Sequence, residues 1–245
     1  PKPSWNLWED RRGIHTFTCA TVVGGLRAAA KFARLFGETE RAEKYERTVN
    51  ETIEAMREHL YSPKLKRFLR SLQFHGDEHY EADTTIDASL FGTFYFGAFD
   101  AKDEMVKNTM RAVEEKLWID TEYGGIARFE NDGYMQVSKE VTGNAWFICT
   151  LWLADYRIAV AESKKDLTGA LEILEWTTKR ALPSGVLAEQ VHPFTGEAVS
   201  VAPLTWSHST FVATLLNYLQ KEKMLKEKMS DVGCRMSVEN NPANI

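Results

Sequence analysis

Helical segments of two kinds alternate along this chain, and their alternation constrains the fold more than any other feature. Apolar residues that recur with a period of 3.6 predict seven helices, at residues 16–36, 38–60, 86–99, 102–117, 144–161, 165–181 and 205–221. The first, third, fifth and seventh segments are apolar or small on most of their circumference, whereas the other three carry a charged face. A helix that is apolar nearly all round must be buried, and one with a charged stripe faces water.

An inner ring of buried helices wrapped by an outer ring explains this alternation. A plain bundle would make every helix amphipathic to a similar degree, so we predict an all-α fold, an α/α toroid. If neighbouring helices are antiparallel, the loops that precede the inner helices converge at one end. Those loops are long and rich in acids and aromatics, which is typical of a functional end. One of them contains Asp83 and Asp87, for which helix capping is an alternative role.

The composition limits the partners of the chain. Its 245 residues allow one large domain, and 30 basic against 35 acidic residues give a formal net charge of -5. Nucleic acid and anionic membranes require concentrated positive charge, so neither is expected as a partner, and no apolar run predicts a membrane span. Cys19, Cys149 and Cys234 form neither a disulfide framework nor a metal-ligand pattern. Unpaired thiols favour a reducing, cytoplasmic location.

Two acidic residues stand just before apolar helices. Glu9 lies between Trp8 and Asp10, and Glu189 precedes Gln190. Indole faces pack well against the flat faces of sugar rings, and carboxylates can hold hydroxyl groups or supply a proton. Two carboxylates at matching positions therefore indicate a glycosidase.

Four stretches together resemble glycoside hydrolase family 15, the glucoamylases and their bacterial and archaeal relatives. They are Leu7-Trp8-Glu9-Asp10, Arg128-Phe129-Glu130-Asn131-Asp132, Gly143-Asn144-Ala145-Trp146, and Glu189-Gln190 with the later Leu204-Thr205-Trp206-Ser207. They follow one another in the order that the family has. This sequence departs from the family at Asp10, Phe129 and Ala145, where the usual residues are Glu, Tyr and Pro.

The resemblance implies a six-hairpin (α/α)6 toroid of twelve helices, in which the general acid precedes the sixth. Helices that begin just after Glu9 then match the last seven, so residues 1–226 are expected to be the C-terminal portion of a catalytic domain. Residues 227–245 form a tail without an assigned role. The upstream half is expected to be required. Because half a toroid exposes inner helices and two edges, the chain alone is expected to be unstable or to self-associate.

The resemblance also implies the roles of the two acids. Glu9 is expected to be the general acid and Glu189 the general base of an inverting hydrolysis, with the carboxyl groups about 6.5–9.5 Å apart to admit a water molecule. Glu9 must be protonated to act. We expect Trp8 and the following apolar helix to favour the protonated form by desolvation.

Five further residues are predicted to bind the sugar. The resemblance implies hydrogen bonds from Asp10, Arg128 and Asp132, and stacking on Trp8 and Trp146. An alternative for Arg128 and Asp132 is an internal ion pair that only supports their loop. An alternative for Trp146 is a core anchor, because it begins a buried helix.

The predicted function is that of an exo-acting, inverting α-glucoside hydrolase of the glucoamylase type. It would release glucose from the nonreducing ends of α-glucans, and isomalto-oligosaccharides or trehalose are further substrates that the resemblance allows. This chemistry requires no metal or redox cofactor. Two alternatives remain open: a non-catalytic glucoamylase-like domain that binds carbohydrate or a partner protein, and a glycoside phosphorylase of another α/α toroid class.

Overall fold

The fold is known from a computed structural model, which describes residues 1–76 and 79–239, with side chains described as far as residue 228. Its α-helices are α1 (Thr16–Leu35), α2 (Thr39–Ala55), α3 (Gly92–Tyr95), α4 (Glu104–Leu117), α5 (Phe147–Val160), α6 (Thr168–Lys179) and α7 (Thr205–Glu239). Three short turns of other helix types accompany them: η1 (Met56–Leu60), η2 (Ala88–Phe91) and η3 (Lys165–Leu167). The chain is therefore rich in helix, as the periodicity predicts.

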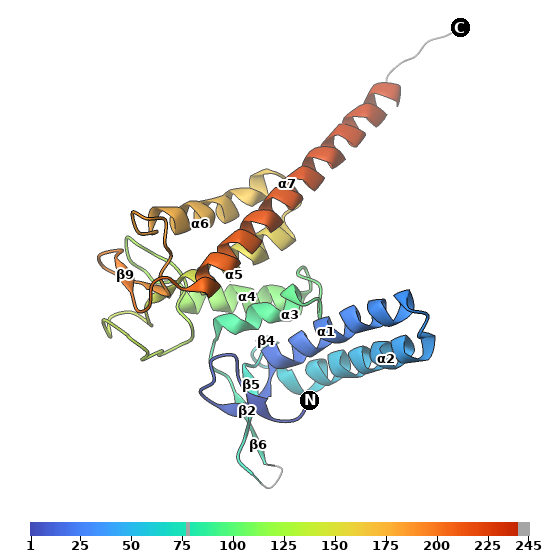
Figure 1. The fold of residues 1–245 in the computed structure, drawn as a ribbon, viewed down its shortest axis with the longest axis horizontal. Coiled ribbons are helices and arrows are strands. Elements are labelled where there is room, and N and C mark those ends of the chain that lie inside the picture. Colours follow the sequence, from blue (N-terminus) through green and yellow to red (C-terminus); the bar gives the residue numbers. More distant parts are fainter. Residues whose placement is uncertain (77–78, 240–245) are drawn as a thin grey trace.

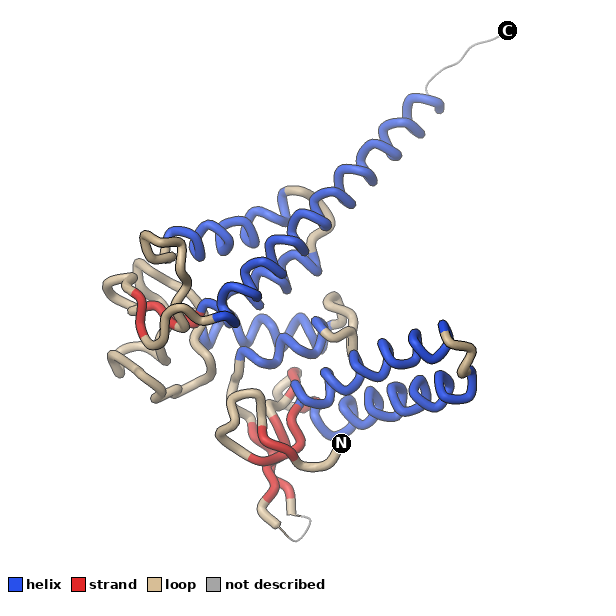
Figure 2. Tube along the Cα trace, viewed as in Figure 1, coloured by secondary structure: helices blue, strands red, loops and turns tan. Residues whose placement is uncertain are grey.

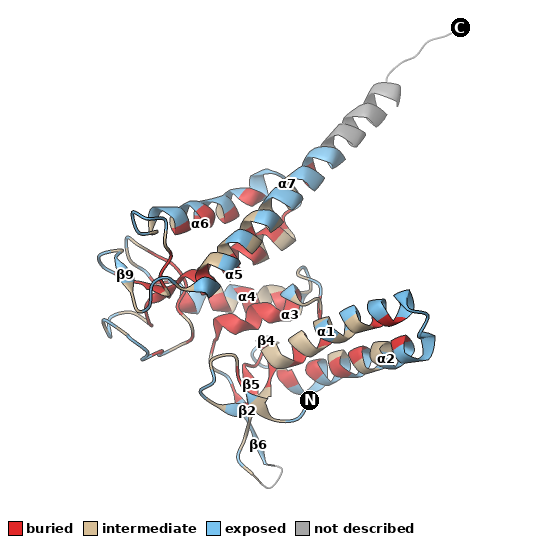
Figure 3. Cartoon of the chain, in the orientation of Figure 1, coloured by how far each residue is buried: buried red, intermediate tan, exposed pale blue. Residues whose placement is uncertain are grey.

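The helices form two layers (Figure 1). In the inner layer α1 contacts α3, α3 contacts α5, and α5 contacts α7. In the outer layer α2 packs on α1, and α6 packs on α5. Burial is heaviest in η2, α3 and α5, whereas α2 and α6 expose one side (Figure 3). The predicted alternation of inner and outer helices is confirmed for these elements.

Short strands are the main departure from an all-α fold. Within the described residues they form three antiparallel sheets: β1 (Ser4–Trp5), β2 (Arg12–His15), β5 (Ser71–Phe74) and β6 (Tyr80–Asp83); β3 (Tyr61–Ser62) and β4 (Arg67–Phe68); and β7 (Ala145–Trp146), β8 (Gln190–Val191) and β9 (Ala198–Val199). The sequence analysis predicted none of these strands. Segments of two to four residues are too short to show a period of two.

The third predicted helix is much shorter than expected. We predicted residues 86–99, but the structure has only η2 and the single turn α3. The side chain of Asp87 accepts a hydrogen bond from the Ser89 backbone at 2.8 Å, which starts the helix after Asp87. Gly97 has a φ of 72°, and a left-handed residue at this place ends a helix.

Helix α7 is longer than expected. We predicted an end near residue 221, but α7 continues to Glu239, into the tail at 227–245 whose role was left unassigned, and projects past its neighbours (Figure 1). Its lysine-rich stretch contains ion pairs one helical turn apart, such as Lys226 with Glu222 at 2.9 Å, and such pairs favour helix. Residues 240–245 of the predicted tail lie outside the described residues.

All the sheets and the long loops gather at one end of the helices, and short connections join the helices at the other end (Figure 2). Strand β2 runs directly into α1 and β7 runs directly into α5. The predicted convergence of the loops that precede the inner helices is therefore confirmed. None of the helices that the structure describes is long and apolar enough to cross a membrane.

Large apolar side chains are exposed on the first and last inner helices. At the end of α1, Phe32, Leu35 and Phe36 are 63%, 76% and 73% exposed, and on α7 Val212 and Leu216 are 54% and 60% exposed. Exposed apolar patches are typical of interaction surfaces, binding grooves or aggregation-prone sites. Both patches lie on helices at the two ends of the inner layer.

The isolated 245-residue chain is therefore expected to self-associate at micromolar concentration, as measured by multi-angle light scattering. Leu216→Glu should reduce association, because it places a charge on the exposed face of α7. Leu171→Glu is the matched control, since Leu171 is 41% exposed but lies on the outer helix α6. A monomeric wild-type chain, or equal effects of the two substitutions, would contradict this expectation.

Asp155 joins α5 to α7, and its burial is expected to make stability depend on pH. It is 5% exposed and accepts hydrogen bonds from Thr214 and Asn217 at 3.1 and 3.0 Å. Burial raises the pKa of Asp155 to about 6, although both hydrogen bonds oppose the shift. The folded state therefore keeps a proton that the unfolded state releases at lower pH.

The free energy of unfolding is expected to fall by about 3 kcal/mol as the pH rises from about 4 through the pKa of Asp155 near 6. Urea unfolding of the wild-type chain and of Asp155→Asn across this range tests the expectation. The variant has no proton to lose at this position and should show a flatter dependence on pH. Parallel curves for the two proteins would show that Asp155 is not the responsible group.

Candidate active site

Glu9 lies at the apex of the loop that joins β1 to β2. The Asn6 backbone N–H donates to the Arg11 carbonyl at 3.0 Å, and the Glu9 N–H donates to the Asn6 carbonyl at 3.1 Å. Glu9 itself has a φ of 58°, in the left-handed region. Glu9 is exposed, so Trp8 and α1 do not bury it as we expected.

Asp10 is held within the same loop. Its Oδ1 accepts from Asn6 Nδ2 at 2.6 Å, and its two oxygens accept from the Arg11 guanidinium at 3.1 and 2.9 Å. Although partial burial acts in the opposite direction, hydrogen bonds from Arg11 and Asn6 hold the pKa of Asp10 below its usual value. Asp10 is thus an ionised acceptor beside Glu9, and its contact with a sugar hydroxyl stays a prediction.

Four indole rings from different parts of the chain meet next to this loop; we call Trp8, Trp146, Trp152 and Trp206 the tryptophan cluster. The ring of Trp8 lies 5.8 Å from that of Trp146 and 6.0 Å from each of the other two. Trp146 is 3% exposed, so within this chain it has the core position that we considered as its alternative. Trp206 keeps 37% of its surface exposed.

Glu189 lies just before β8. Its Oε2 accepts hydrogen bonds from Gln190 Nε2 at 3.0 Å and from Ser200 Oγ at 2.6 Å. Gln190 pairs with Trp146 across β7 and β8. The two predicted catalytic acids therefore stand on separate loops that both adjoin the tryptophan cluster.

Asn144 has no role in the sequence analysis, but it supports the Glu189 loop. Its Nδ2 donates to Gln190 Oε1 at 2.7 Å and to the Met135 carbonyl at 2.8 Å, and its Oδ1 accepts from the Val137 N–H at 3.2 Å. The buried amide thus connects the loop around residue 135 to the residue next to Glu189. The only signal in the sequence is the place of Asn144 between Gly143 and Trp146.

Arg128 and Asp132 form a bidentate ion pair, with nitrogen to oxygen distances of 2.8 and 2.7 Å. The side chains are 12% and 3% exposed. The guanidinium carbon also lies 5.2 Å from the Trp8 ring centre and 4.9 Å from that of Trp146. The internal ion pair that we considered as an alternative is therefore present, and binding of sugar by this pair stays a prediction.

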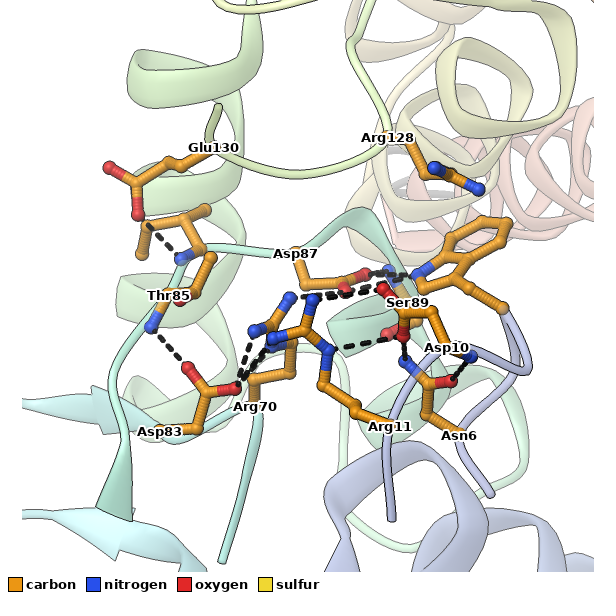
Figure 4. Close-up of polar contacts among 12 residues, drawn as sticks. Asn6, Asp10, Arg11, Arg70, Asp83, Thr85, Asp87, Ser89, Arg128 and Glu130 are labelled. Carbon is orange, nitrogen blue, oxygen red and sulfur yellow. Dashed lines mark hydrogen bonds and ion pairs between the residues drawn. The ribbon is translucent and has the colours of Figure 1, made fainter. Parts of the chain in front are cut away.

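Beneath the Glu9 loop lies a buried polar group that the sequence did not reveal as a unit (Figure 4). Arg70 is 4% exposed and bonds to Asp83 through Nε at 2.7 Å. Asp87 is fully buried, and its two carboxylate oxygens accept hydrogen bonds from Trp8 Nε1 at 3.1 and 3.0 Å. We had placed Asp83 and Asp87 in a loop at the functional end, with helix capping as an alternative, and had not singled out Arg70. The contact between Trp8 and Asp87 spans 79 positions of sequence.

Carboxylates on two loops beside an aromatic platform, at the loop end of a layer of helical hairpins, are suited to protonate a leaving oxygen and to activate water. This is the arrangement expected of a glycoside hydrolase. A family model agrees: residues 1–216 match the glycosyl hydrolases family 15, and the chain belongs to this family.

Curated relatives have related names. The chain is 28% identical to an uncharacterized glycosyl hydrolase of Methanocaldococcus jannaschii, with 86% of the chain and 33% of the relative covered. It is 27% identical to a glucoamylase of a Clostridium species, with the same coverage, and 25% identical to a trehalase of Mycolicibacterium smegmatis, with 91% and 31% covered. The chain therefore spans about a third of the length of these relatives.

A solved structure supports the fold. The crystal structure of a bacterial glucoamylase complexed with acarbose superposes with a TM-score of 0.77 at 22% identity, over 91% of this chain and 36% of that one. At this identity the likeness concerns the fold. It places the described helices within the helical architecture of that protein class.

Proposed function

We propose that the protein is an inverting, exo-acting α-glucoside hydrolase of the glucoamylase type, with Glu9 as general acid and Glu189 as general base. One observation carries the proposal: the loops of the two acids adjoin a single tryptophan cluster. Trp8, which precedes Glu9, packs against Trp146, and Trp146 pairs with the residue that follows Glu189. In this proposal, two loops that are distant in sequence supply one carboxylate each beside the same tryptophan cluster.

The proposed chemistry follows from this arrangement. Glu9 donates its proton to the glycosidic oxygen, while Glu189 removes a proton from a water molecule that attacks the anomeric carbon from the opposite face. Gln190 and Ser200 both donate to Oε2 of Glu189, which fixes the carboxylate and directs Oε1 to the water. The product is glucose with inverted, β configuration at the anomeric carbon.

The sugar-binding wall is proposed to consist of Asp10, Trp8 and the Arg128–Asp132 pair. Trp8 keeps part of its surface exposed, so one indole face serves as a stacking surface. The guanidinium of Arg128 is held among aromatic rings, which orients its remaining N–H groups toward a hydroxyl. Trp146 contributes by supporting Trp8 from the core.

We further propose that residues 1–226 are the C-terminal portion of an (α/α)6 catalytic domain, namely the last seven of twelve helices. The exposed apolar faces of α1 and α7 are the edges on which the upstream helices would pack. The upstream half would also cover Glu9, which is exposed in this chain, and so supply the desolvation that favours its protonated form.

The test is glucose release from maltotetraose, isomaltotriose and trehalose by the protein that includes its upstream half. We expect release from at least one of these substrates. By proton NMR the first glucose from maltotetraose or isomaltotriose should be the β anomer, and trehalose should give equal amounts of β- and α-glucose. α-Glucose as the first product from maltotetraose or isomaltotriose, or α-glucose alone from trehalose, would contradict inversion. Binding of the sugars without release would identify a non-catalytic carbohydrate-binding domain, and formation of a sugar phosphate only with added phosphate would identify a phosphorylase.

A further inference from the structure

The indole of Trp8 is bound to a fully buried carboxylate. Asp87 accepts from Trp8 Nε1 through both oxygens, at 3.1 and 3.0 Å, and its Oδ1 also accepts from the Ser89 backbone at 2.8 Å. Since Asp87 caps η2, it is fixed to the inner helical layer. Trp8 is therefore held at its N–H by Asp87 and at its ring by the tryptophan cluster.

A buried arginine accompanies this carboxylate. Nη1 of Arg70 is 3.7 Å from Oδ2 of Asp87 and is buried without a hydrogen-bond partner among the described residues. Nε of Arg70 donates to Asp83, and the guanidinium faces the ring of Phe129 at 5.4 Å. Burial raises the pKa of Asp87, while Ser89 and the positive charge of Arg70 oppose the shift. Arg70 thus lies between two acids, Asp83 and Asp87 (Figure 4).

The same group reaches the other side of Glu9. Arg11 binds both oxygens of Asp10, and its Nη1 is 3.7 Å from Oδ2 of Asp83. The residue before Glu9 is therefore tied to Asp87, and the residue after it is tied through Arg11 to Asp83. Glu9 has a left-handed backbone between these two attachments, and such a conformation persists only where the surroundings over-determine it.

We propose that Arg70, Asp83 and Asp87 form a buried clamp that positions Glu9 from both sides, with Asp87 acting through Trp8 and Asp83 through Arg11. The clamp residues do not touch the substrate in this proposal; they are positioning residues. This inference rests on the proposed role of Glu9 as general acid. Displacement of a catalytic group by about 1 Å can lower a rate about a hundredfold, so a clamp of this kind has a measurable effect on turnover.

The first experiment compares Asp87→Asn, Trp8→Phe and the double variant in the protein that includes its upstream half. Asparagine keeps the shape of the side chain but cannot accept from Trp8 with two anionic oxygens, and phenylalanine cannot donate. We expect both single variants to lower kcat about 10- to 100-fold. Asp87→Asn should change KM less than kcat, whereas Trp8→Phe should also raise KM because it alters the proposed stacking surface. If Asp87 acts through Trp8, the double variant is no slower than the slower single variant. Multiplicative losses would overturn the proposal.

Asp155→Asn is the matched control for Asp87→Asn. Asp155 is also a buried, hydrogen-bonded aspartate, but its partners Thr214 and Asn217 lie on α7. We expect its substitution to leave kcat within about twofold of the wild type, because distant sites act independently. A loss of kcat as large as that of Asp87→Asn would show that any buried aspartate has this effect and would overturn the clamp.

The second arm of the clamp provides a variant that is expected to fold. Arg11→Met removes a half-exposed guanidinium, and the neighbouring Arg12→Met is its control, since Arg12 is exposed and makes no ion pair with the described residues. We expect Arg11→Met to lower kcat about two- to fivefold, as loss of a partly exposed ion pair does, and Arg12→Met to have no effect. Equal activity of the two variants would overturn the Asp83 arm.

An activity-independent measurement uses the indole N–H signals in proton–nitrogen NMR spectra, with Trp8 assigned by the signal missing in Trp8→Phe. In the wild type the N–H of Trp8 should exchange slowly with solvent, because it is bonded to Asp87. In Asp87→Asn this signal should move and exchange faster, and fast exchange in the wild type would overturn the proposal. If Glu9→Gln leaves glucose release intact, the proposed function is wrong. If release depends on Glu9 but Asp87→Asn leaves kcat unchanged, only the clamp is wrong.

Discussion

Replacing Glu9 by glutamine is expected to lower kcat for glucose release from maltotetraose about 10²- to 10⁴-fold, the usual contribution of a positioned general acid. Glutamine has nearly the same shape and can occupy the same exposed position at the apex of the β1–β2 loop, so the loop and the tryptophan cluster should remain intact. The substitution removes only the proton that the leaving oxygen requires. Initial rates with the protein that includes its upstream half give the measurement.

The proposed roles of Glu9 and Glu189 can be distinguished by comparing two substrates. α-Glucosyl fluoride carries a leaving group that departs without protonation, so Glu9→Gln should lose far less activity on the fluoride than on maltotetraose. Glu189→Gln should lose activity on both, because water must still be activated. Glu122→Gln, at an exposed loop glutamate near the same end, should behave as the wild type. Equal losses of Glu9→Gln on both substrates would assign Glu9 a role other than general acid.

The second large effect is expected from the ion pair between Arg128 and Asp132. Asp132→Ala leaves the guanidinium of Arg128, whose side chain is 12% exposed, without its partner in the interior. Breaking a buried pair from one side typically costs about 3–5 kcal/mol, and contacts of Arg128 with the surrounding rings should keep the loss near the lower end. Urea unfolding monitored by tryptophan fluorescence measures it.

A more exposed ion pair of the same chain provides the comparison. Glu114 accepts from Arg157 at 2.6 Å with side-chain exposures of 42% and 28%, and Glu114→Ala should cost less than about 1 kcal/mol. If Asp132→Ala is no more destabilising than Glu114→Ala, the pair does not support the loop. A rise in KM at unchanged stability would instead indicate that Asp132 acts by holding the sugar.

The sequence predicts well those features that repeat along the chain. The 3.6-residue period marks the long helices, and their alternation of apolar and charged faces separates α1, α5 and α7 from α2, α4 and α6. The periodicity predicts η2 and α3 poorly. The apolar stretch around Phe94 is buried because neighbouring elements cover it, whatever the spacing of its apolar residues. The periodicity also fails at the strands, because a two-residue strand such as β7 forms only by pairing with a segment that is distant in sequence.

The predicted site residues are those that stand close together in sequence, such as Trp8, Glu9 and Asp10. Their supports are distant: Asp87 lies 79 positions from Trp8, and Asn144 lies 46 positions from Gln190. A contact of this length leaves no local pattern. Arg70 is the extreme case, because an arginine at the end of the basic stretch 64–70 resembles any surface residue until the fold buries it.

The left-handed backbone at Glu9 and Ser200 sets stability against the proposed chemistry. At both positions a glycine would adopt the same backbone without the steric cost of a side chain, which is about 1–2 kcal/mol. A selection for heat resistance alone would therefore favour glycine at 9 and at 200, and it would remove the proposed acid and a hydrogen-bond donor to the proposed base. Stabilising substitutions should therefore be sought on the outer helices, with these two positions left unchanged.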